Sequence, residues 1–169
     1  MYTGAAVVMG VASCGKTVVG EAIAAGLGVR FIEGDHLHAP ASIAKMSAGI
    51  ALTDDDRWPW LARIGEALGA PGGVIVSCSA LKKSYRQAIA DAAGRPVSFI
   101  FLNGSRALLE QRMGSRQGHF MPTSLLSSQL ATLEIPSLDE GAIALDIANP
   151  TAVLAQQAID FLTRGTAHD

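Results

Sequence analysis

The octapeptide at residues 10–17 constrains the fold more than any other feature, because it reads GVASCGKT and fits the pattern GxxxxGK[ST]. It follows the apolar run AAVVM and precedes a stretch in which Val19, Ile23 and Leu27 recur at a spacing of four. Gly28 follows directly and is expected to end this helix in a left-handed conformation. A strand, a glycine loop and a helix in this order form the context in which the motif wraps around a phosphate. The chain is therefore expected to begin with a strand–loop–helix unit that binds a nucleotide.

Short runs rich in β-branched residues alternate with longer helical patterns along the whole chain. The five runs are AAVVM, RFIE, GVIVSCS, VSFIFLN and AIALDI. Four of them are almost continuously apolar, as expected for strands that are covered on both faces. Such alternation implies right-handed crossovers. The predicted fold is α/β, a three-layer, doubly wound sheet of five parallel strands.

Composition limits the size of the protein and its partners. The 169 residues, 49% of them apolar, are enough for one well-buried core, so a single domain over residues 1–169 is expected. The net charge of -2 gives no basic excess for nucleic acid or an anionic membrane. No apolar run is long enough to cross a bilayer, and MYTGAAVVMG lacks the charged start of a signal peptide. These observations predict a cytoplasmic protein with a small-molecule partner.

Cys14 and Cys78 have no CxxC pattern and no His at metal-ligand spacing, so neither a disulfide nor a metal site is expected of them. Cys14 is interpreted as a small side chain that tolerates the tight loop. A redox switch at Cys14 is the alternative.

The loop motif predicts which groups hold ATP. Its backbone N–H groups and the helix N-terminus face the β-phosphate, Lys16 bridges the β- and γ-phosphates, and the Thr17 hydroxyl binds Mg²⁺. The predicted nucleotide-binding residues of the loop are Gly10, Val11, Ala12, Ser13, Cys14, Gly15, Lys16 and Thr17.

Two acidic residues follow the second apolar run and predict an acceptor site. The sequence there reads EGDHLH, with Glu33 and Asp35 one residue apart at the carboxyl end of a strand. Both acids are expected on the same side of the extended chain, beside the point where the first strand delivers the glycine loop. Asp35 is the candidate to orient an attacking hydroxyl and accept its proton, and Glu33 to reach Mg²⁺ through water. His38 is a candidate hydrogen-bonding partner for a polyol. Alternatively, both acids are solvated and His38 only packs.

Basic residues gather after the third run, in CSALKKSYR. With Ser79 beside them at a strand end, Lys82 and Arg86 are candidates to bind an anionic substrate, and Arg57 to hold a carboxylate. The alternative is a solvated basic helix face. The acidic triplet before Arg57, residues 54–56, is interpreted mainly as the cap of a helix that begins there.

Two further arginines lie four residues apart on one predicted helix face. Arg112 and Arg116 lead into a Gly-rich stretch, residues 115–123, that is interpreted as a lid. An arginine closing over the γ-phosphate would neutralise charge in the transition state, so Arg116 joins Lys16 and Asp35 as a predicted catalytic residue. Surface arginines without a role are the alternative.

Several longer segments together resemble the gluconokinase family. These are GVASCGKT, EGDHLH, KMSAGIALTDDDRWPWL, CSALKKSYR, FLNGSRALLEQRMGSRQGHFMP and SQLATLEIP. The resemblance covers nearly the whole chain and implies a nucleoside-monophosphate-kinase-like fold, use of MgATP to phosphorylate the 6-hydroxyl of D-gluconate, and a homodimer.

The resemblance also implies roles for individual residues. Asp35 would lie at the acceptor hydroxyl, and Arg57, Lys82 and Arg86 would meet the gluconate carboxylate or hydroxyls. Similarity to the wider kinase fold places Arg112 near adenine and Arg116 on the phosphates. It also places Asn149 and Pro150 beside the base.

Two rival functions remain open. One is a related kinase acting on shikimate or another sugar acid, and the other is a nucleotide-binding regulatory module without an acceptor.

Overall fold

A single parallel sheet forms the centre of the molecule, as predicted. The structure is a computed structural model and describes residues 1–114 and 123–164. The strands lie in the order β2-β3-β1-β4-β5, and every neighbouring pair is parallel. Their bounds are Ala5–Met9 (β1), Arg30–Glu33 (β2), Val74–Ser77 (β3), Val97–Asn103 (β4) and Ala142–Asp146 (β5). All five strands coincide with the predicted runs or lie within them.

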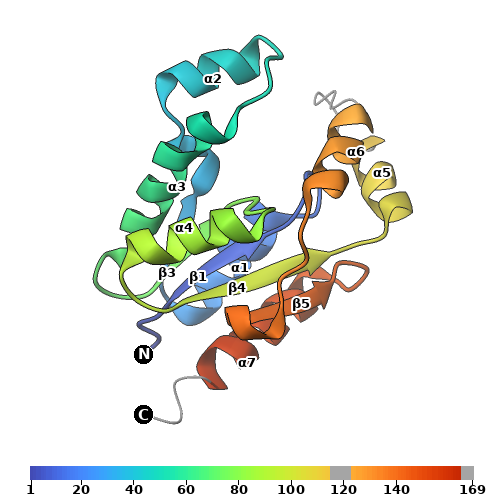
Figure 1. Cartoon of the computed structure of the whole chain (residues 1–169). Helices are drawn as coiled ribbons and strands as arrows, with labels where there is room; N and C mark the ends of the chain where they lie inside the picture. Colours follow the sequence, from blue (N-terminus) through green and yellow to red (C-terminus); the bar gives the residue numbers. More distant parts are fainter. Residues whose placement is uncertain (115–122, 165–169) are drawn as a thin grey trace.

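Helices cover both faces of the sheet, which gives the predicted three layers (Figure 1). On one face the core joins alternate strand residues such as Val8 and Ile100 to helices α1 (Lys16–Leu27) and α7 (Thr151–Arg164). On the other face, strand residues such as Val7 and Phe99 pack against α3 (Asp54–Gly69) and α4 (Lys83–Ala93). The buried strands are apolar on both sides because both sides are covered.

The remaining elements stand near the carboxyl ends of the strands. They are the turn η1 (Gly34–Leu37) and helices α2 (Pro40–Ser47), α5 (Arg106–Gly114) and α6 (Thr123–Thr132). A second short turn, η2 (Leu138–Glu140), precedes β5. Figure 1 shows α2 extending away from the sheet at the top, and α5 and α6 at the upper right.

Helix ends follow the predicted signals. Gly28, at φ 68°, ends α1 in the left-handed conformation expected just beyond Leu27. At the start of α3, the Thr53 hydroxyl accepts from the Asp56 N–H while the Asp56 carboxylate accepts from the Thr53 N–H, which is a capping box. The acidic triplet therefore does cap this helix, as predicted, although Asp54 also has a second role described below.

One spatial expectation was wrong. The second strand was expected to end beside the strand that delivers the glycine loop, but β3 lies between β1 and β2. Asp35 also lies in the turn η1 instead of on the extended strand. The two acids therefore do not lie on one side of an extended chain, and the turn sets their separation.

Candidate active site

The loop at residues 10–17 connects β1 to α1 at the carboxyl edge of the sheet. Gly10 has φ 147° and Gly15 has φ 96°, conformations that side chains other than hydrogen rarely allow. Ser13 also has a positive φ, of 67°, and its buried hydroxyl has no hydrogen-bond partner within the described residues. The backbone is thus wound as an anion-binding loop, in agreement with the motif.

Lys16 lies over the first half of this loop. Its Nζ donates to the carbonyl oxygens of Gly10 and Val11, both at 3.1 Å, and lies 3.9 Å from Cys14 Sγ. Cys14 itself is buried, 1% exposed, and packs in the core. The Lys16 ammonium group therefore lies against the loop whose bound phosphates it is predicted to contact.

Thr17 and Glu33 are brought together although 16 residues separate them. The Thr17 hydroxyl donates to Glu33 Oε2, and the Ser77 hydroxyl donates to Glu33 Oε1 at 2.7 Å. One hydroxyl and one carboxylate from two elements are oxygen donors of the type that Mg²⁺ uses next to nucleotide phosphates. Within the described ranges, no group of three or more His, Cys, Asp or Glu side chains gathers into a metal-binding cluster.

The turn η1 presents Asp35, which is exposed, and α3 holds the turn at both ends. Trp60 Nε1 donates to the Gly34 carbonyl at 2.8 Å, and Arg63 Nε donates to the Leu37 carbonyl at 2.7 Å. Gly34 is needed here because a Cβ at this position would overlap the Ser77 carbonyl oxygen. The backbone around Asp35 is therefore fixed by contacts to both α3 and β3.

His38 follows the turn and is buried against Trp60, with the two rings stacked at 4.0 Å. Burial lowers the pKa of His38 below its usual 6.5, although the charge of Asp35 opposes this effect. Its Nδ1 is buried and makes no hydrogen bond to the described part of the chain. His38 therefore packs against Trp60, and its contact with a polyol hydroxyl stays a prediction.

Arg57 and Lys82 gather around one acid, Asp54. Arg57 Nη1 lies 3.5 Å from Asp54 Oδ1, and Lys82 Nζ lies 3.6 Å from Asp54 Oδ2. The Tyr85 hydroxyl donates to Asp54 Oδ1 at 2.5 Å, and both cations lie over the Tyr85 ring. The hydrogen bond from Tyr85 lowers the pKa of Asp54, and burial raises that of Tyr85. The predicted anion-binding pair is thus assembled, with one cation more than its acid neutralises.

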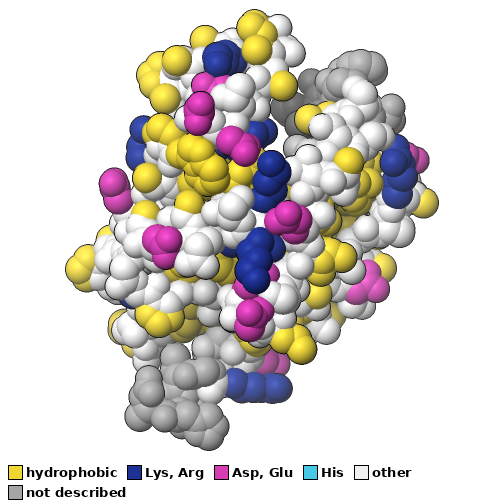
Figure 2. Space-filling model, in the orientation of Figure 1, with side chains coloured by type: hydrophobic (Ala, Val, Ile, Leu, Met, Phe, Trp, Pro, Cys, Tyr) yellow, Lys and Arg dark blue, Asp and Glu magenta, His cyan; other side chains and the backbone are white. Residues whose placement is uncertain are grey.

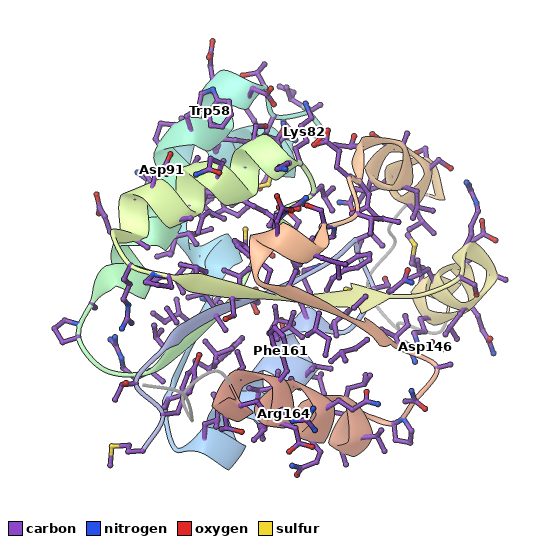
Figure 3. All side chains as sticks on the ribbon, turned by 60° about the horizontal axis from the view of Figure 1, so that its bottom comes forward. Trp58, Lys82, Asp91, Asp146, Phe161 and Arg164 are labelled. Atoms are coloured by element: carbon purple, nitrogen blue, oxygen red, sulfur yellow. The ribbon has the colours of Figure 1, made fainter. Side chains whose placement is uncertain are left out.

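Lys82 of this cluster lies at the start of α4. Figure 3 shows Trp58 on α3, and Lys82 at the opposite end of α4 from Asp91. Figure 2 shows basic and acidic side chains side by side along the middle of the face in view, without a large patch of one sign. This face therefore has no basic patch of the kind that binds nucleic acid.

Arg86 corrects the sequence-based prediction of a substrate contact. Its side chain is 2% exposed and Nε donates to Glu140 Oε1 at 2.7 Å. Nη1 donates to the Ala80 and Leu81 carbonyls at 2.8 and 3.3 Å. A guanidinium buried and bonded in this way cannot meet a ligand, so Arg86 supports the loop before α4 instead.

Burial alone would raise the pKa of Glu140. Hydrogen bonds from Arg86 and from the Ser137 N–H outweigh burial and hold this pKa at about 2. Glu140, which pairs with Arg86, lies 54 residues later in the chain. Nothing in the local sequence of either residue indicates this pairing.

Parts of the predicted adenine site lie close together. Arg112 Nη2 donates to the Ile147 carbonyl at 2.6 Å, directly before the turn that contains Asn149 and Pro150.

Ser79 lies two residues beyond β3, and its carbonyl accepts from the Gly10 N–H at 3.3 Å. Arg116 and lid residues 115–122 lie outside the described residues.

Comparison with known proteins supplies the remaining evidence. No protein-family model matches the chain. A gluconokinase of Gluconobacter oxydans (strain 621H) is 49% identical over 141 residues, which cover 81% of this chain and 79% of the relative. The chain belongs to the gluconokinase family. A crystal structure of a gluconokinase from Sinorhizobium meliloti 1021 superposes with a TM-score of 0.89 at 53% identity, covering 96% of this chain and 93% of the other.

Likeness to shikimate kinases extends to the fold alone. A shikimate kinase from Aquifex aeolicus has a TM-score of 0.61 at 11% identity. The gluconokinase family therefore provides the relevant comparison for the site, and the P-loop kinase fold is shared more widely. Within the described residues of this gluconokinase-family chain, no helix has both the length and the apolar content needed to span a bilayer.

Three residues that position the gluconokinase site were not predicted from the sequence. Trp60 and Arg63 were interpreted only as parts of a helix, and Asp54 only as a helix cap. The sequence does carry one signal for Asp54, because Arg57 follows it at the i,i+3 spacing that allows a charge pair on a helix.

Proposed function

We propose that this chain transfers the γ-phosphoryl group of ATP to the 6-hydroxyl of D-gluconate and releases ADP and 6-phospho-D-gluconate. The observation that carries the proposal is the phosphate loop with Lys16, set beside Glu33 and the Asp35 turn in a chain of the gluconokinase family. Transfer is in line and needs no covalent enzyme intermediate, so the protein acts mainly by positioning and charge neutralisation.

The nucleotide lies along the loop. Backbone N–H groups of the loop receive the phosphates, apart from those of Gly10 and Ala12, which donate to Ser79 and Gln129. Lys16 lies between the β- and γ-phosphates. The adenine ring lies near Arg112 and the turn at Asn149 and Pro150, whose proximity supports this placement. Arg116 is proposed to reach the phosphates from the lid.

The sugar acid lies between the turn η1 and the basic cluster. Asp35 orients the attacking hydroxyl and accepts its proton as the bond to phosphorus forms. Arg57 and Lys82 hold the carboxylate, and His38 and Ser79 are proposed to contact hydroxyl groups. The excess of positive charge around Asp54 supports the position of the carboxylate.

Mg²⁺ is the proposed metal cofactor, held by the Thr17 hydroxyl directly and by Glu33 through water. The contact between the two side chains supports the pairing, because an ion that takes its other ligands from phosphates and water suits this arrangement. When bound, the ion would neutralise charge on the β- and γ-phosphates.

A steady-state assay of ADP release tests the function and separates it from its rivals. Parallel reactions contain D-gluconate, shikimate or no acceptor, each with Mg²⁺ and with EDTA. We expect turnover that depends on both D-gluconate and Mg²⁺. Faster turnover with shikimate would indicate a different small-molecule kinase. ADP release that is equally fast without any acceptor would refute the proposal.

The proposed setting is a homodimer in the cytoplasm. Edge strand β5 and the segment before it support an interface between two copies, because Ile135 and Leu138 there are 68% and 98% exposed. Sedimentation velocity at micromolar concentration should give twice the mass of the chain, and a monomer would refute the dimer. Cell fractionation should place the protein in the soluble fraction, and recovery with membranes would refute the location.

A further inference from the structure

One side chain of helix α6, Gln129, forms a hydrogen bond with the phosphate loop. The Ala12 N–H donates to Gln129 Oε1 at 2.6 Å, although 117 residues separate the two. A backbone N–H can only donate, so the carboxamide oxygen must face the loop and the NH₂ group remains as a donor. In the described ranges, no atom accepts a hydrogen bond from that NH₂ group.

The position of Gln129 is fixed at both ends of its helix. Leu126, one turn earlier, is fully buried in the core. Beyond the end of the helix, the Glu134 N–H donates to the Leu81 carbonyl, and Glu134 Oε1 accepts from the Lys83 N–H, both at 2.8 Å. The carboxamide is therefore presented by an anchored helix, as functional groups that must be placed accurately usually are.

Ala12 lies at the end of the loop that faces the terminal phosphate. Lys16, which reaches the β- and γ-phosphates in such loops, lies against the Gly10 and Val11 carbonyls. The Gly10 N–H in turn donates to the Ser79 carbonyl, at the end of the strand that leads to the basic cluster. A group bonded to Ala12 is therefore on the acceptor side of the nucleotide.

We propose that Gln129 is a further catalytic residue, whose NH₂ group donates to the γ-phosphoryl group while its oxygen stays bonded to the Ala12 N–H. The inference rests on the proposed function. During transfer the bond from phosphorus to the ADP oxygen breaks, the bond to the gluconate hydroxyl oxygen forms, and the proton passes to Asp35. Gln129 changes no bond, and its donor stabilises charge on the transferred oxygens.

Two substitutions at Gln129 separate this role from simple anchoring of the loop. Gln129→Ala removes both contacts. Gln129→Glu retains an oxygen for the Ala12 N–H but places a negative charge where the NH₂ group stood. We expect Gln129→Ala to lower kcat by about tenfold or more, with KM for D-gluconate unchanged, because a directed donor is lost. Gln129→Glu should be slower still.

The opposite order of activities would overturn the inference. If Gln129 only anchors the loop, Gln129→Glu keeps that bond and is at least as active as Gln129→Ala. Wild-type rates in both variants would also overturn it. The matched control is Gln156→Ala on α7, where the side chain of an exposed Gln donates to Asp160 four residues later, and it should retain the wild-type rate. Circular dichroism and thermal unfolding check that each variant folds.

Nucleotide titration separates failure of this inference from failure of the proposed function. Calorimetry with ADP and with a non-hydrolysable ATP analogue needs no acceptor. Gln129→Ala should lower the affinity for the triphosphate analogue several-fold and leave the affinity for ADP within about twofold of wild type, because only the γ-phosphate contacts Gln129. An equal loss of affinity for both nucleotides, or no loss for either, would contradict the inference. A wild-type protein that fails to phosphorylate D-gluconate would refute only the function.

Discussion

The residues of the site make two kinds of contact: some join segments that the sequence motifs identify, and others join segments that no motif connects. The contact between Thr17 and Glu33 joins two elements that the motif and the next strand identify directly. The pair of Arg86 and Glu140, by contrast, joins α4 to η2 and leaves Arg86 without access to a ligand. Side-chain type and strand-end position could predict the contact between Thr17 and Glu33. The ion pair of Arg86 and Glu140 could not be predicted in this way, because it depends on how distant segments fold together.

Asp35 provides the first prediction at this scale. Asp35→Asn retains the size of the side chain but cannot accept a proton, so kcat should fall by about 10²-fold or more. Affinity for ATP should be unchanged, because Asp35 lies on η1 and outside the phosphate loop. Stopped-time assays and nucleotide titration measure the two quantities. A variant with normal turnover would remove Asp35 from the mechanism.

Glu140 provides a prediction on pH. Its pKa of about 2 in the folded state lies below the ordinary 4.5, so ionised Glu140 stabilises the fold above about pH 4.5. That stabilisation is lost as the pH falls from about 4.5 towards 2. Glu140→Gln should lower the free energy of unfolding by about 3 kcal/mol at pH 7, because Arg86 is left buried without its acid.

Urea unfolding at pH 7, 5, 4 and 3 measures the effect. The difference between wild type and Glu140→Gln should shrink as the pH falls, whereas exposed Glu66, replaced by Gln, should show little difference at any pH. A constant difference between wild type and Glu140→Gln across this range would contradict the assigned ion pair.

At the scale of elements, the helix α3 positions the site more than its sequence suggests. Trp60 and Arg63 hold the two ends of η1, and Asp54 at its start organises Arg57 and Lys82. One helix thus places both the proton acceptor and the anion-binding cations.

Trp60→Phe tests this positioning. The substitution keeps an aromatic ring but removes the N–H that donates to the buried Gly34 carbonyl at 2.8 Å. We expect a loss of about 1–2 kcal/mol in the free energy of unfolding. A several-fold decrease in kcat, with KM for ATP unchanged, should accompany it, because the turn carries Asp35. Trp58→Phe on the same helix is the control, since Trp58 is 37% exposed and contacts Tyr85 edge-on. Equal effects of the two substitutions would argue against a specific role for the turn.

The elements themselves were predicted more completely than their arrangement. Runs such as RFIE are readable because apolar β-branched residues and flanking turns are local signals. The helix α2 was not predicted, and Ser42 is its only buried residue, so it lacks an apolar stripe. The insertion of β3 between β1 and β2 was also missed, because strand order depends on pairing between segments far apart in the chain.

At the scale of the whole molecule, the sheet brings both substrates to one edge. The carboxyl ends of β1, β2 and β3 supply the phosphate loop, the turn with Asp35 and the segment with Ser79 and Lys82. Ligands of open α/β sheets collect at such an edge. Membership of the gluconokinase family and the geometry of these loops lead to the same conclusion, that a phosphoryl group passes from ATP to a sugar acid across this edge.

Identification of the reaction product by ³¹P and ¹³C NMR tests that conclusion most directly. The purified chain is incubated with MgATP and uniformly ¹³C-labelled D-gluconate until ATP is consumed. We expect one phosphomonoester for each ADP formed, with phosphorus–carbon coupling that places the phosphate on the C6 oxygen. Inorganic phosphate as the only new phosphorus signal beside ADP, or an ester at another carbon, would contradict the proposed transfer.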